Sequence, residues 1–252
     1  MDRRSQFQEA KNFTIYYGHG MEEKLSNYDV AIIESRGHSP EGLKVIKARK
    51  CLAIAYISLV EINPSDYYYR YLKDEDFIHC NGKVEINSIY GNYLVDIQSK
   101  RWQDILMHEC GKLLDGLDYD GIFIDTIGNV ENHKILKEYN SALICESVLL
   151  FARLRSKYPQ HIIIQNNAIE RLIHFTSGII DGICWENPPV DKKSSRLWMQ
   201  EIINSLNKIK EIDKLKVFVV LESENLDDAR KLQLFDNLGY LTYLSSFNYL
   251  NI

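Results

Sequence analysis

The sequence contains short apolar runs that each end on an acidic or amide side chain. Four of them are GIFIDT, IIIQNN, GICWEN and VFVVLES, which end on Asp125, on Asn166 and Asn167, on Glu186 and on Glu222. Strands buried on both faces of a parallel sheet have such continuous Val, Ile and Leu runs. In a parallel barrel, residues at the carboxyl ends of the strands form the active site. The pattern therefore favours a parallel barrel with an acidic site at its strand ends.

Stretches with helical spacing lie between the apolar runs. Their apolar residues recur three or four positions apart, which indicates helices with one buried face. Ser39 before Pro40, and Asp227 with Asp228, are typical helix starts. Strands that alternate with helices indicate an α/β fold, and eight such units predict a (β/α)8 TIM barrel. The predicted strands cover residues 13–17, 30–34, 52–58, 121–125, 161–166, 182–186, 217–222 and 240–244, and the predicted helices contain residues 43–46, 102–114, 142–154, 197–209 and 229–238.

One long stretch does not fit this alternation. Residues 63–92 are rich in Tyr and carry the turn signals Asn81-Gly82 and Gly91-Asn92, and a ninth apolar run follows at residues 93–97. We predict an insertion after the third strand, with a short extra strand. Irregular segments of this length often form lids or binding loops. The tyrosines at positions 67, 68, 69 and 71 either stack on sugar rings or pack the insertion onto the barrel.

Length and charge limit the class of protein. A chain of 252 residues fits one (β/α)8 domain spanning residues 1–252. Its formal net charge of −5 is spread along the chain, without a basic stripe for nucleic acid or a polybasic membrane anchor. No apolar stretch approaches the roughly 18 residues of a membrane span, and the charged start MDRRSQFQEAKNF does not resemble a signal peptide. We predict no nucleic-acid or membrane partner, and either a cytoplasmic protein or a secreted one whose signal has been removed.

Motifs for common cofactors and nucleophiles are missing from the sequence. It has neither GxGxxG after a strand nor GxxxxGK[ST], and its seven histidines form neither HxH nor HExxH. It also lacks the GxSxG elbow of serine hydrolases. The five cysteines show no CxxC spacing, and three of them lie beside apolar strand or helix residues and are predicted to be small buried side chains. We therefore predict no cofactor and no metal site.

Asp125 and Glu186 are the candidate catalytic residues. They end the fourth and sixth predicted strands, and alternate strands of a barrel contribute side chains to the same interior layer. The two carboxylates are therefore expected to face each other across the barrel mouth. Glycoside hydrolysis needs two such groups, one to protonate the leaving oxygen and one to act as nucleophile or base. The competing interpretation is that each acid caps the following helix.

Other polar or aromatic side chains near the strand ends could contact a sugar. Carboxylates there can hold hydroxyls or amines, or can instead cap helices and pair with Lys, whereas amides supply both donors and acceptors. A tryptophan beside a carboxylate could supply an apolar wall. The candidate substrate-binding residues are Glu34, Tyr56, Ser58, Glu61, Asn166, Asn167, Trp185 and Glu222.

Longer segments of the chain also match a known pattern. They are AYISLVEINPSD, YGNYLVDIQSKRWQDIL, LDYDGIFIDTIGN, IIIQNNAIE, DGICWENP and VFVVLESE. In this order they resemble the barrel motifs of glycoside hydrolase family 114 and its bacterial relatives, a family typified by endo-α-1,4-polygalactosaminidase. The resemblance implies a TIM-barrel glycosidase with Asp125 and Glu186 as its catalytic carboxylates. By analogy with related barrel glycosidases, Asp125 would be the nucleophile and Glu186 the acid/base, or the reverse.

The sequence departs from the polygalactosaminidase pattern in two places. Glu34 stands where an Asp usually ends the second strand, and Gly91-Asn92-Tyr93 replaces a Glu-Arg pair before LVDI, as in the bacterial branch. The leading hypothesis is an endo-acting glycosidase that cleaves an amino-sugar polysaccharide, such as α-1,4-linked galactosamine. The alternative is a non-catalytic carbohydrate-binding TIM barrel whose acids hold amino groups. A barrel enzyme for phosphorylated metabolites would need a glycine-rich phosphate loop after the seventh or eighth strand, which the sequence lacks.

Overall fold

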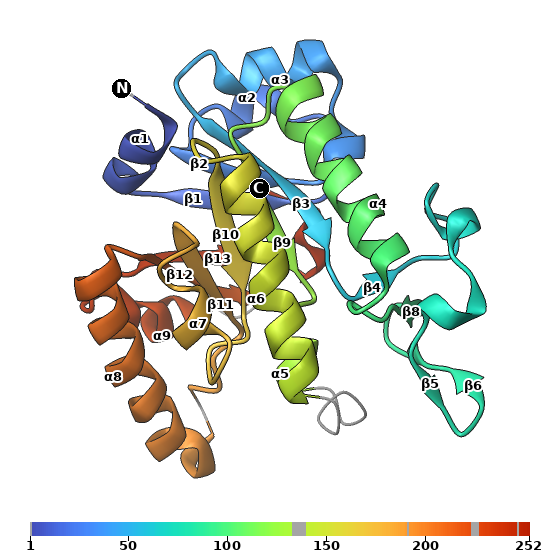
Figure 1. Cartoon of the computed structure of the whole chain (residues 1–252). Coiled ribbons are helices and arrows are strands. Elements are labelled where there is room, and N and C mark those ends of the chain that lie inside the picture. The colour runs from blue at the N-terminus through green and yellow to red at the C-terminus, as the bar shows by residue number, and fades with distance from the viewer. Residues whose placement is uncertain (1, 133–139, 191, 223–226, 246) are drawn as a thin grey trace.

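The structure of the protein is a computed structural model that describes residues 2–132, 140–190, 192–222, 227–245 and 247–252. Eight parallel strands form one sheet that curls into a nearly closed barrel, with helices outside it (Figure 1). The predicted α/β TIM-barrel fold is therefore confirmed. In sheet order, the strands are β1 (Phe13–Tyr16), β2 (Val30–Ile33), β3 (Leu52–Ser58), β9 (Gly121–Asp125), β10 (Ile162–Asn166), β11 (Gly182–Glu186), β12 (Lys216–Glu222) and β13 (Leu241–Ser245).

Alternation along the strands leads from an apolar barrel interior to a polar mouth. Phe123 on β9 and Cys184 on β11 belong to the buried core inside the barrel. Side chains two residues apart on a strand share a face. The next inward positions are therefore those of Asp125 and Glu186, which end the same strands. The apolar core thus continues directly into the candidate site.

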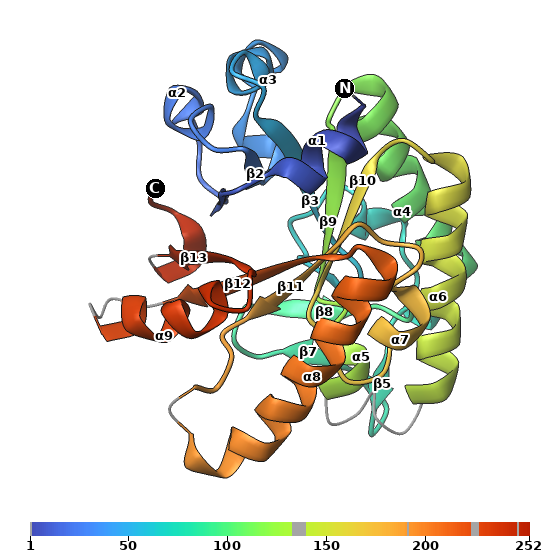
Figure 2. The ribbon, with the colours of Figure 1, turned by 90° about the vertical axis from the view of Figure 1, so that its left-hand side faces the viewer.

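The other face of each strand packs against the helices, and Figure 2 shows α6 and α8 outside the sheet. The helix α3 begins as predicted, because Ser39 Oγ accepts from Gly42 N at 3.1 Å and Pro40 occupies the first turn. The helices are α1 (Arg3–Glu9), α2 (Glu22–Leu25), α3 (Pro40–Lys47), α4 (Lys100–Gly111), α5 (Asn129–Asn132), α6 (Asn140–Lys157), α7 (Ile173–Thr176), α8 (Arg196–Asp213) and α9 (Asp227–Asp236).

The helix α1 was not predicted, and it packs against the strand starts of the barrel. Its Phe7 is fully buried, with its ring 5.6 Å from that of Phe218 near the start of β12. Arg3 pairs with Asp120 at 2.9 Å, and Arg4 pairs with Asp181 at 2.6 Å. These contacts cover the amino-terminal end of the barrel, so the strand ends on the other side carry the site.

The first and last strands of the sheet meet through aromatic side chains. The rings of Phe13 on β1 and Tyr243 on β13 lie 5.6 Å apart. Beyond the strand ends, Tyr17 N donates to Tyr249 O at 2.9 Å. Tyr249 belongs to a 3-10 turn, Phe247–Tyr249, that follows β13. The segment after the last strand therefore folds over the barrel mouth.

The insertion after β3 is confirmed, and it forms two small antiparallel sheets. One contains β4 (Glu61–Ile62), β8 (Asn92–Leu94) and β7 (Ile86–Asn87), and the other pairs β5 (His79–Cys80) with β6 (Lys83–Val84). The predicted extra strand at residues 93–97 corresponds to the shorter β8. Unlike a structureless lid, the insertion has its own backbone pairing.

A buried carboxylate, that of Glu61, fastens this insertion to the barrel. Glu61 is 3% exposed and accepts from Asn87 Nδ2 at 2.8 Å, Asn92 Nδ2 at 2.9 Å and Asn129 Nδ2 at 2.7 Å. The first two donors lie in the insertion and the third in α5. The Glu61 carboxylate thus accepts three hydrogen bonds from protein amides, and these contacts anchor the insertion. The sequence had predicted that Glu61 binds substrate.

Two further sequence predictions concern the cysteines and membrane-spanning segments. Cys51, Cys110 and Cys184 are buried as predicted, whereas Cys80 is half-buried and Cys145 is exposed. Within the described ranges, no helix has both the length and the apolar character that a membrane span requires.

Candidate active site

The carboxylates of Asp125 and Glu186 converge on one side chain, that of Asn166. Asn166 Nδ2 donates to Asp125 Oδ1 at 2.7 Å and to Glu186 Oε2 at 2.8 Å. Because one nitrogen reaches both oxygens, these oxygens are at most about 5.5 Å apart. Asn166 ends the fifth barrel strand, between the fourth and sixth strands that carry the acids. Three of the predicted site residues therefore form one constellation.

The local environment of this pair favours uptake of a proton. Burial, followed by the negative charge of Glu186, raises the pKa of Asp125 to about 6. Hydrogen bonds from Asn166 and Tyr56 partly oppose this effect by stabilising the ionised form. A proton on Asp125 removes the repulsion between the two carboxylates. At mildly acidic pH the site can therefore hold one acid and one carboxylate, which is the combination that acid-assisted displacement needs.

Three tyrosines surround the pair, and two of them were not predicted. The Tyr17 ring lies 4.9 Å from the Tyr56 ring and 5.3 Å from the Tyr249 ring, and Tyr249 Oη donates to Glu186 Oε1. Burial raises the pKa of Tyr17, Tyr56 and Tyr249 well above the ordinary value, so all three remain neutral donors. The alternation of Phe13 and Ile15 could have identified Tyr17, which is the next inward position. Tyr249 lies in an irregular turn that no sequence pattern predicts.

A fourth tyrosine, Tyr90, reaches the mouth from the turn between β7 and β8. Its side chain is 64% exposed. Burial raises the pKa of Tyr90, and so do the negative charges of Glu186, Glu222, Asp125 and Glu61. The sequence pattern singled out the tyrosines at 67, 68, 69 and 71 and not Tyr90, because only the folded insertion brings Tyr90 toward these charges.

Asn167 and Glu222 hold backbone groups at the rim. Asn167 has a left-handed backbone (φ 57°), and its Oδ1 accepts from Glu186 N at 3.1 Å. Asn187 (φ 50°) repeats this arrangement one strand later, accepting from Glu222 N at 2.8 Å. Glu222 Oε1 in turn accepts from Asn248 N in the turn that carries Tyr249. These residues thus position the strand ends and the turn, and their predicted contact with sugar stays a prediction.

Glu34, Tyr56 and Ser58 lie together beside Asp125, where they line one cavity. Glu34 is occupied by Arg36, whose Nε and Nη2 donate to its two oxygens at 3.1 Å. Ser58 Oγ donates to Glu61 O at 2.8 Å. Ser58 is also the register partner of Asp125 between β3 and β9, and Tyr56 and Asp125 each shift the pKa of the other. Their predicted binding of substrate remains to be tested.

The prediction for Trp185 is wrong. Its side chain is 2% exposed and belongs to the core between the sheet and the helices. The Trp185 ring packs 6.0 Å from Trp198 on α8 and 5.7 Å from Phe235 on α9. Adjacent residues on a strand point to opposite faces, so Trp185 must point outward when Glu186 points inward.

The described part of the chain has no group of three or more His, Cys, Asp or Glu side chains arranged to hold a metal ion. His133 lies outside the described residues.

A parallel barrel with two convergent carboxylates at its strand ends is the arrangement of a glycosidase. The model of glycoside-hydrolase family GH114 matches residues 2–187, and the protein belongs to this family. The match confirms the resemblance found in the sequence and the prediction of a glycosidase. A search of curated proteins gave no match.

Solved structures share the fold over nearly the whole chain. The glycoside hydrolase domain of PelA from Pseudomonas aeruginosa is similar with a TM-score of 0.78 and 16% identity, over 96% of this chain and 97% of that one. Ega3 from Aspergillus fumigatus, solved as a complex with galactosamine, gives a TM-score of 0.75 and 12% identity, over 96% and 94%. The α-galactosidase TtGalA from Thermus thermophilus gives 0.64 and 12%, over 92% of this chain and 57% of that one. At these identities the likeness establishes the fold alone.

Proposed function

We propose that the protein cleaves internal bonds of an amino-sugar polysaccharide, with α-1,4-linked galactosamine as the leading candidate, through Asp125 and Glu186. The observation that carries this proposal is the single Asn166 amide that binds both carboxylates. Divergent acids would favour the alternative of a carbohydrate-binding barrel without catalysis, whereas convergent ones favour bond cleavage. Family membership and the galactosamine complex of Ega3 support the choice of substrate.

The short distance between the acids supports a retaining mechanism. Retaining pairs are separated by about 5–5.5 Å, whereas inverting pairs leave about 6.5–9.5 Å for a water molecule. The two oxygens that share Asn166 are at most about 5.5 Å apart. The family resemblance gives Asp125 as the nucleophile that attacks the anomeric carbon and Glu186 as the acid that protonates the leaving oxygen, whereas the raised pKa of Asp125 favours the reverse assignment. In either assignment the former acid then takes a proton from water, which attacks the same carbon and releases the nucleophile.

An amino sugar also suits the charge of the mouth. Asp125, Glu186 and Glu222 each end a barrel strand at this side of the sheet, so the mouth carries several negative charges. A site lined with one sign of charge concentrates ligands of the other sign. Free amino groups are protonated at neutral pH, so de-N-acetylated chains are expected to be better substrates than fully acetylated ones.

The test is release of reducing ends from a partially deacetylated α-1,4-linked galactosaminoglycan. Asp125→Asn and Glu186→Gln should each reduce the rate by at least about a hundredfold, because each removes a catalytic group. Glu211→Gln, an exposed change on α8, serves as the charge-matched control. Full activity in both variants of the catalytic pair would refute the mechanism. Binding without cleavage by the unmodified protein would support the carbohydrate-binding alternative.

The roles of the two acids can be separated with aryl glycosides. A substrate with a good leaving group needs no acid, so Glu186→Gln should recover glycosylation activity on it and Asp125→Asn should not. Recovery in Asp125→Asn alone would reverse the assignment. The anomer released first, followed by proton NMR, would decide between retention and inversion.

A further inference from the structure

A cavity of about 700 Å³ lies beside the catalytic pair, and we call it the side cavity. Its walls are the end of β3, the start of the insertion and one flank of α4. Tyr56 lines this cavity, and the pKa values of Tyr56 and Asp125 are shifted by each other. Ser58, another lining residue, is the partner of Asp125 in the register of β3 with β9. The side cavity therefore borders the site of bond cleavage, and its volume falls within the range of ligand pockets.

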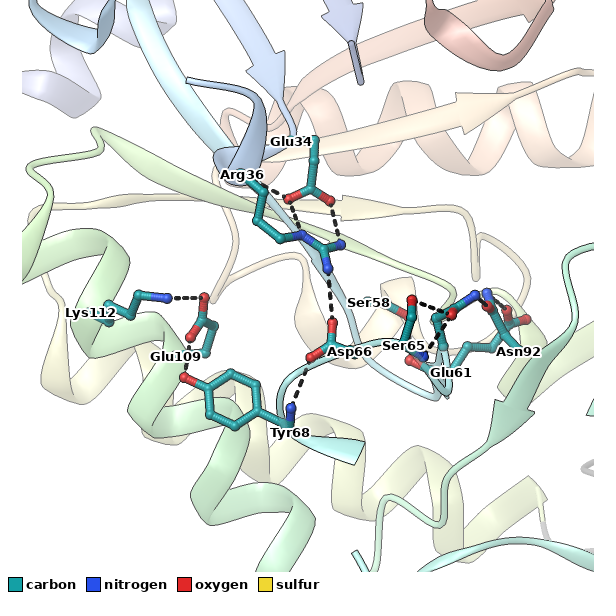
Figure 3. Close-up of polar contacts among 11 residues, drawn as sticks. Glu34, Arg36, Ser58, Glu61, Ser65, Asp66, Tyr68, Asn92, Glu109 and Lys112 are labelled. Atoms are coloured by element: carbon teal, nitrogen blue, oxygen red, sulfur yellow. Dashed lines mark hydrogen bonds and ion pairs between the residues drawn. The ribbon is translucent and has the colours of Figure 1, made fainter. Parts of the chain in front are cut away.

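A polar network fixes the wall of the side cavity that faces β2 (Figure 3). Arg36 binds both oxygens of Glu34, and its Nη1 lies 3.3 Å from Asp66 Oδ2. Asp66 Oδ1 accepts from Tyr68 N at 3.1 Å. The start of the insertion is thus tied to the loop after β2.

The same network continues to α4 on the opposite wall. Tyr68 Oη donates to Glu109 Oε2 at 2.5 Å, and Lys112 Nζ lies 3.4 Å from Glu109 Oε1 (Figure 3). The insertion therefore bridges two elements of the barrel and holds the cavity open between them. A preformed site of this kind loses little conformational entropy when it binds a ligand.

The lining combines an apolar floor with a polar rim. Trp102, Ile105 and Leu106 on α4 supply apolar surface, and Trp102 Nε1 is already satisfied by Leu59 O at 2.7 Å. Hydroxyl, amide and charged groups surround this surface. Sugars present both apolar ring faces and hydroxyl groups, so this combination suits a sugar residue.

The charge of the lining indicates which kind of sugar would bind. Four carboxylates line the cavity, those of Glu34, Glu61, Asp66 and Glu109, against the two cations of Arg36 and Lys112. Glu109 has only Lys112, more than 3 Å away, as its cationic partner in this network. The excess negative charge favours a protonated amino sugar over an acetylated or acidic one.

We propose that the side cavity is a subsite for a residue of the polysaccharide some distance from the scissile bond, and that it selects a residue with a free amino group through Glu109. This inference rests on the proposed function, because it requires a polymer held between Asp125 and Glu186. It makes the enzyme prefer long, de-N-acetylated chains over short ones.

The test uses α-1,4-galactosamine oligosaccharides from the disaccharide to the hexasaccharide, with Glu109→Gln as the variant. The Gln oxygen can still accept from Tyr68, so the shape is kept and the charge is lost. For the parent protein, kcat/KM should rise with chain length once the side cavity is filled. In Glu109→Gln the loss should be about tenfold greater on the longest chain than on the shortest, as expected for one contact with a charged group. Glu211→Gln should leave kcat/KM at the parental value for every chain length.

Binding to a variant with an inactive catalytic pair separates this inference from the proposed function. In the Glu186→Gln background, calorimetry should show tighter binding of long galactosamine chains, weakened by adding Glu109→Gln. This pattern without cleavage by the parent protein would keep the subsite and refute the proposed function. Cleavage with an equal loss at every chain length in Glu109→Gln would refute the subsite and keep the function. Equal affinity for the fully N-acetylated hexasaccharide would overturn the selection of amino groups.

Discussion

We expect the ionised carboxylate of Asp125 to lower the free energy of unfolding, although the proposed reaction needs this group. Burial and the charge of Glu186 raise the pKa of Asp125 from 3.8 in the unfolded chain to about 6 in the folded protein. The folded state therefore binds the proton more tightly, and stability falls as pH rises from about 4 to about 6. At 1.36 kcal/mol per pH unit the full penalty is about 3 kcal/mol, and solvent screening of the half-buried group reduces it to about 1–3 kcal/mol.

Asp125→Asn mimics the protonated form and should remove this penalty. We expect the variant to be about 1–3 kcal/mol more stable than the parent protein at pH 8 and nearly equal to it at pH 4, while cleavage is lost. Urea unfolding at both pH values measures the difference. For a protein of this size, thermal unfolding should shift by about 2–4 °C for each kcal/mol.

Asp120→Asn is the matched control. Asp120 is equally an acid of the barrel, but it pairs with Arg3 at 2.9 Å and Lys47 at 3.2 Å and accepts from Ala53 N at 3.0 Å. The same chemical change should therefore destabilise the protein at pH 8. If Asp125→Asn were also destabilising at pH 8, or had the same effect at both pH values, repulsion within the catalytic pair would be refuted.

Three further predictions concern single contacts. Asn166→Leu removes hydrogen bonds to both carboxylates. At about 1.5–3 kcal/mol per bond, this change should move the acidic limb of the pH profile of kcat/KM up by about 1–2 pH units. An unmoved limb would show that the amide does not stabilise the ionised carboxylates. Glu61→Gln places an amide donor against amide donors, so it should lower the free energy of unfolding, measured in urea, by about 1–3 kcal/mol. It should also speed proteolysis within residues 63–92. Unchanged proteolysis would argue against the anchoring role of Glu61. Gly121→Ala would bring a Cβ within 2.3 Å of Ile162 O, and we expect a loss of about 1–3 kcal/mol or failure to fold, whereas parental stability would contradict the close approach of β9 and β10.

The barrel could be predicted from the sequence because its strands follow a simple rule. Their apolar runs are continuous, and the structure places β3, β9 and β11 at the predicted residues. The same rule predicted that Asp125 and Glu186 lie close together, since strand parity puts them in one layer. It also contained the correction for Trp185, because a residue next to an inward carboxylate must face outward.

The remaining parts of the site depend on irregular segments. The role of Glu61 is set by three amides that are distant in sequence, and Tyr249 reaches Glu186 from a turn with positive φ values. Asn166 was predicted to bind sugar, but its bridging of the two acids depends on a rotamer that a sequence pattern does not encode. Such contacts are decided by tertiary packing, for which local periodicity gives no signal.

The hydrogen bonds that the side chains of Asn167 and Asn187 accept affect how the loops of this barrel can vary between relatives. Each side chain accepts a hydrogen bond from the main-chain N–H group of the acid that ends the next strand. Each Asn directly follows its own strand, so neither contact depends on residues further along the loop. Loop length and composition can therefore diverge between relatives without displacing Glu186 and Glu222. New specificities can arise by exchanging loops around an unchanged chemical centre.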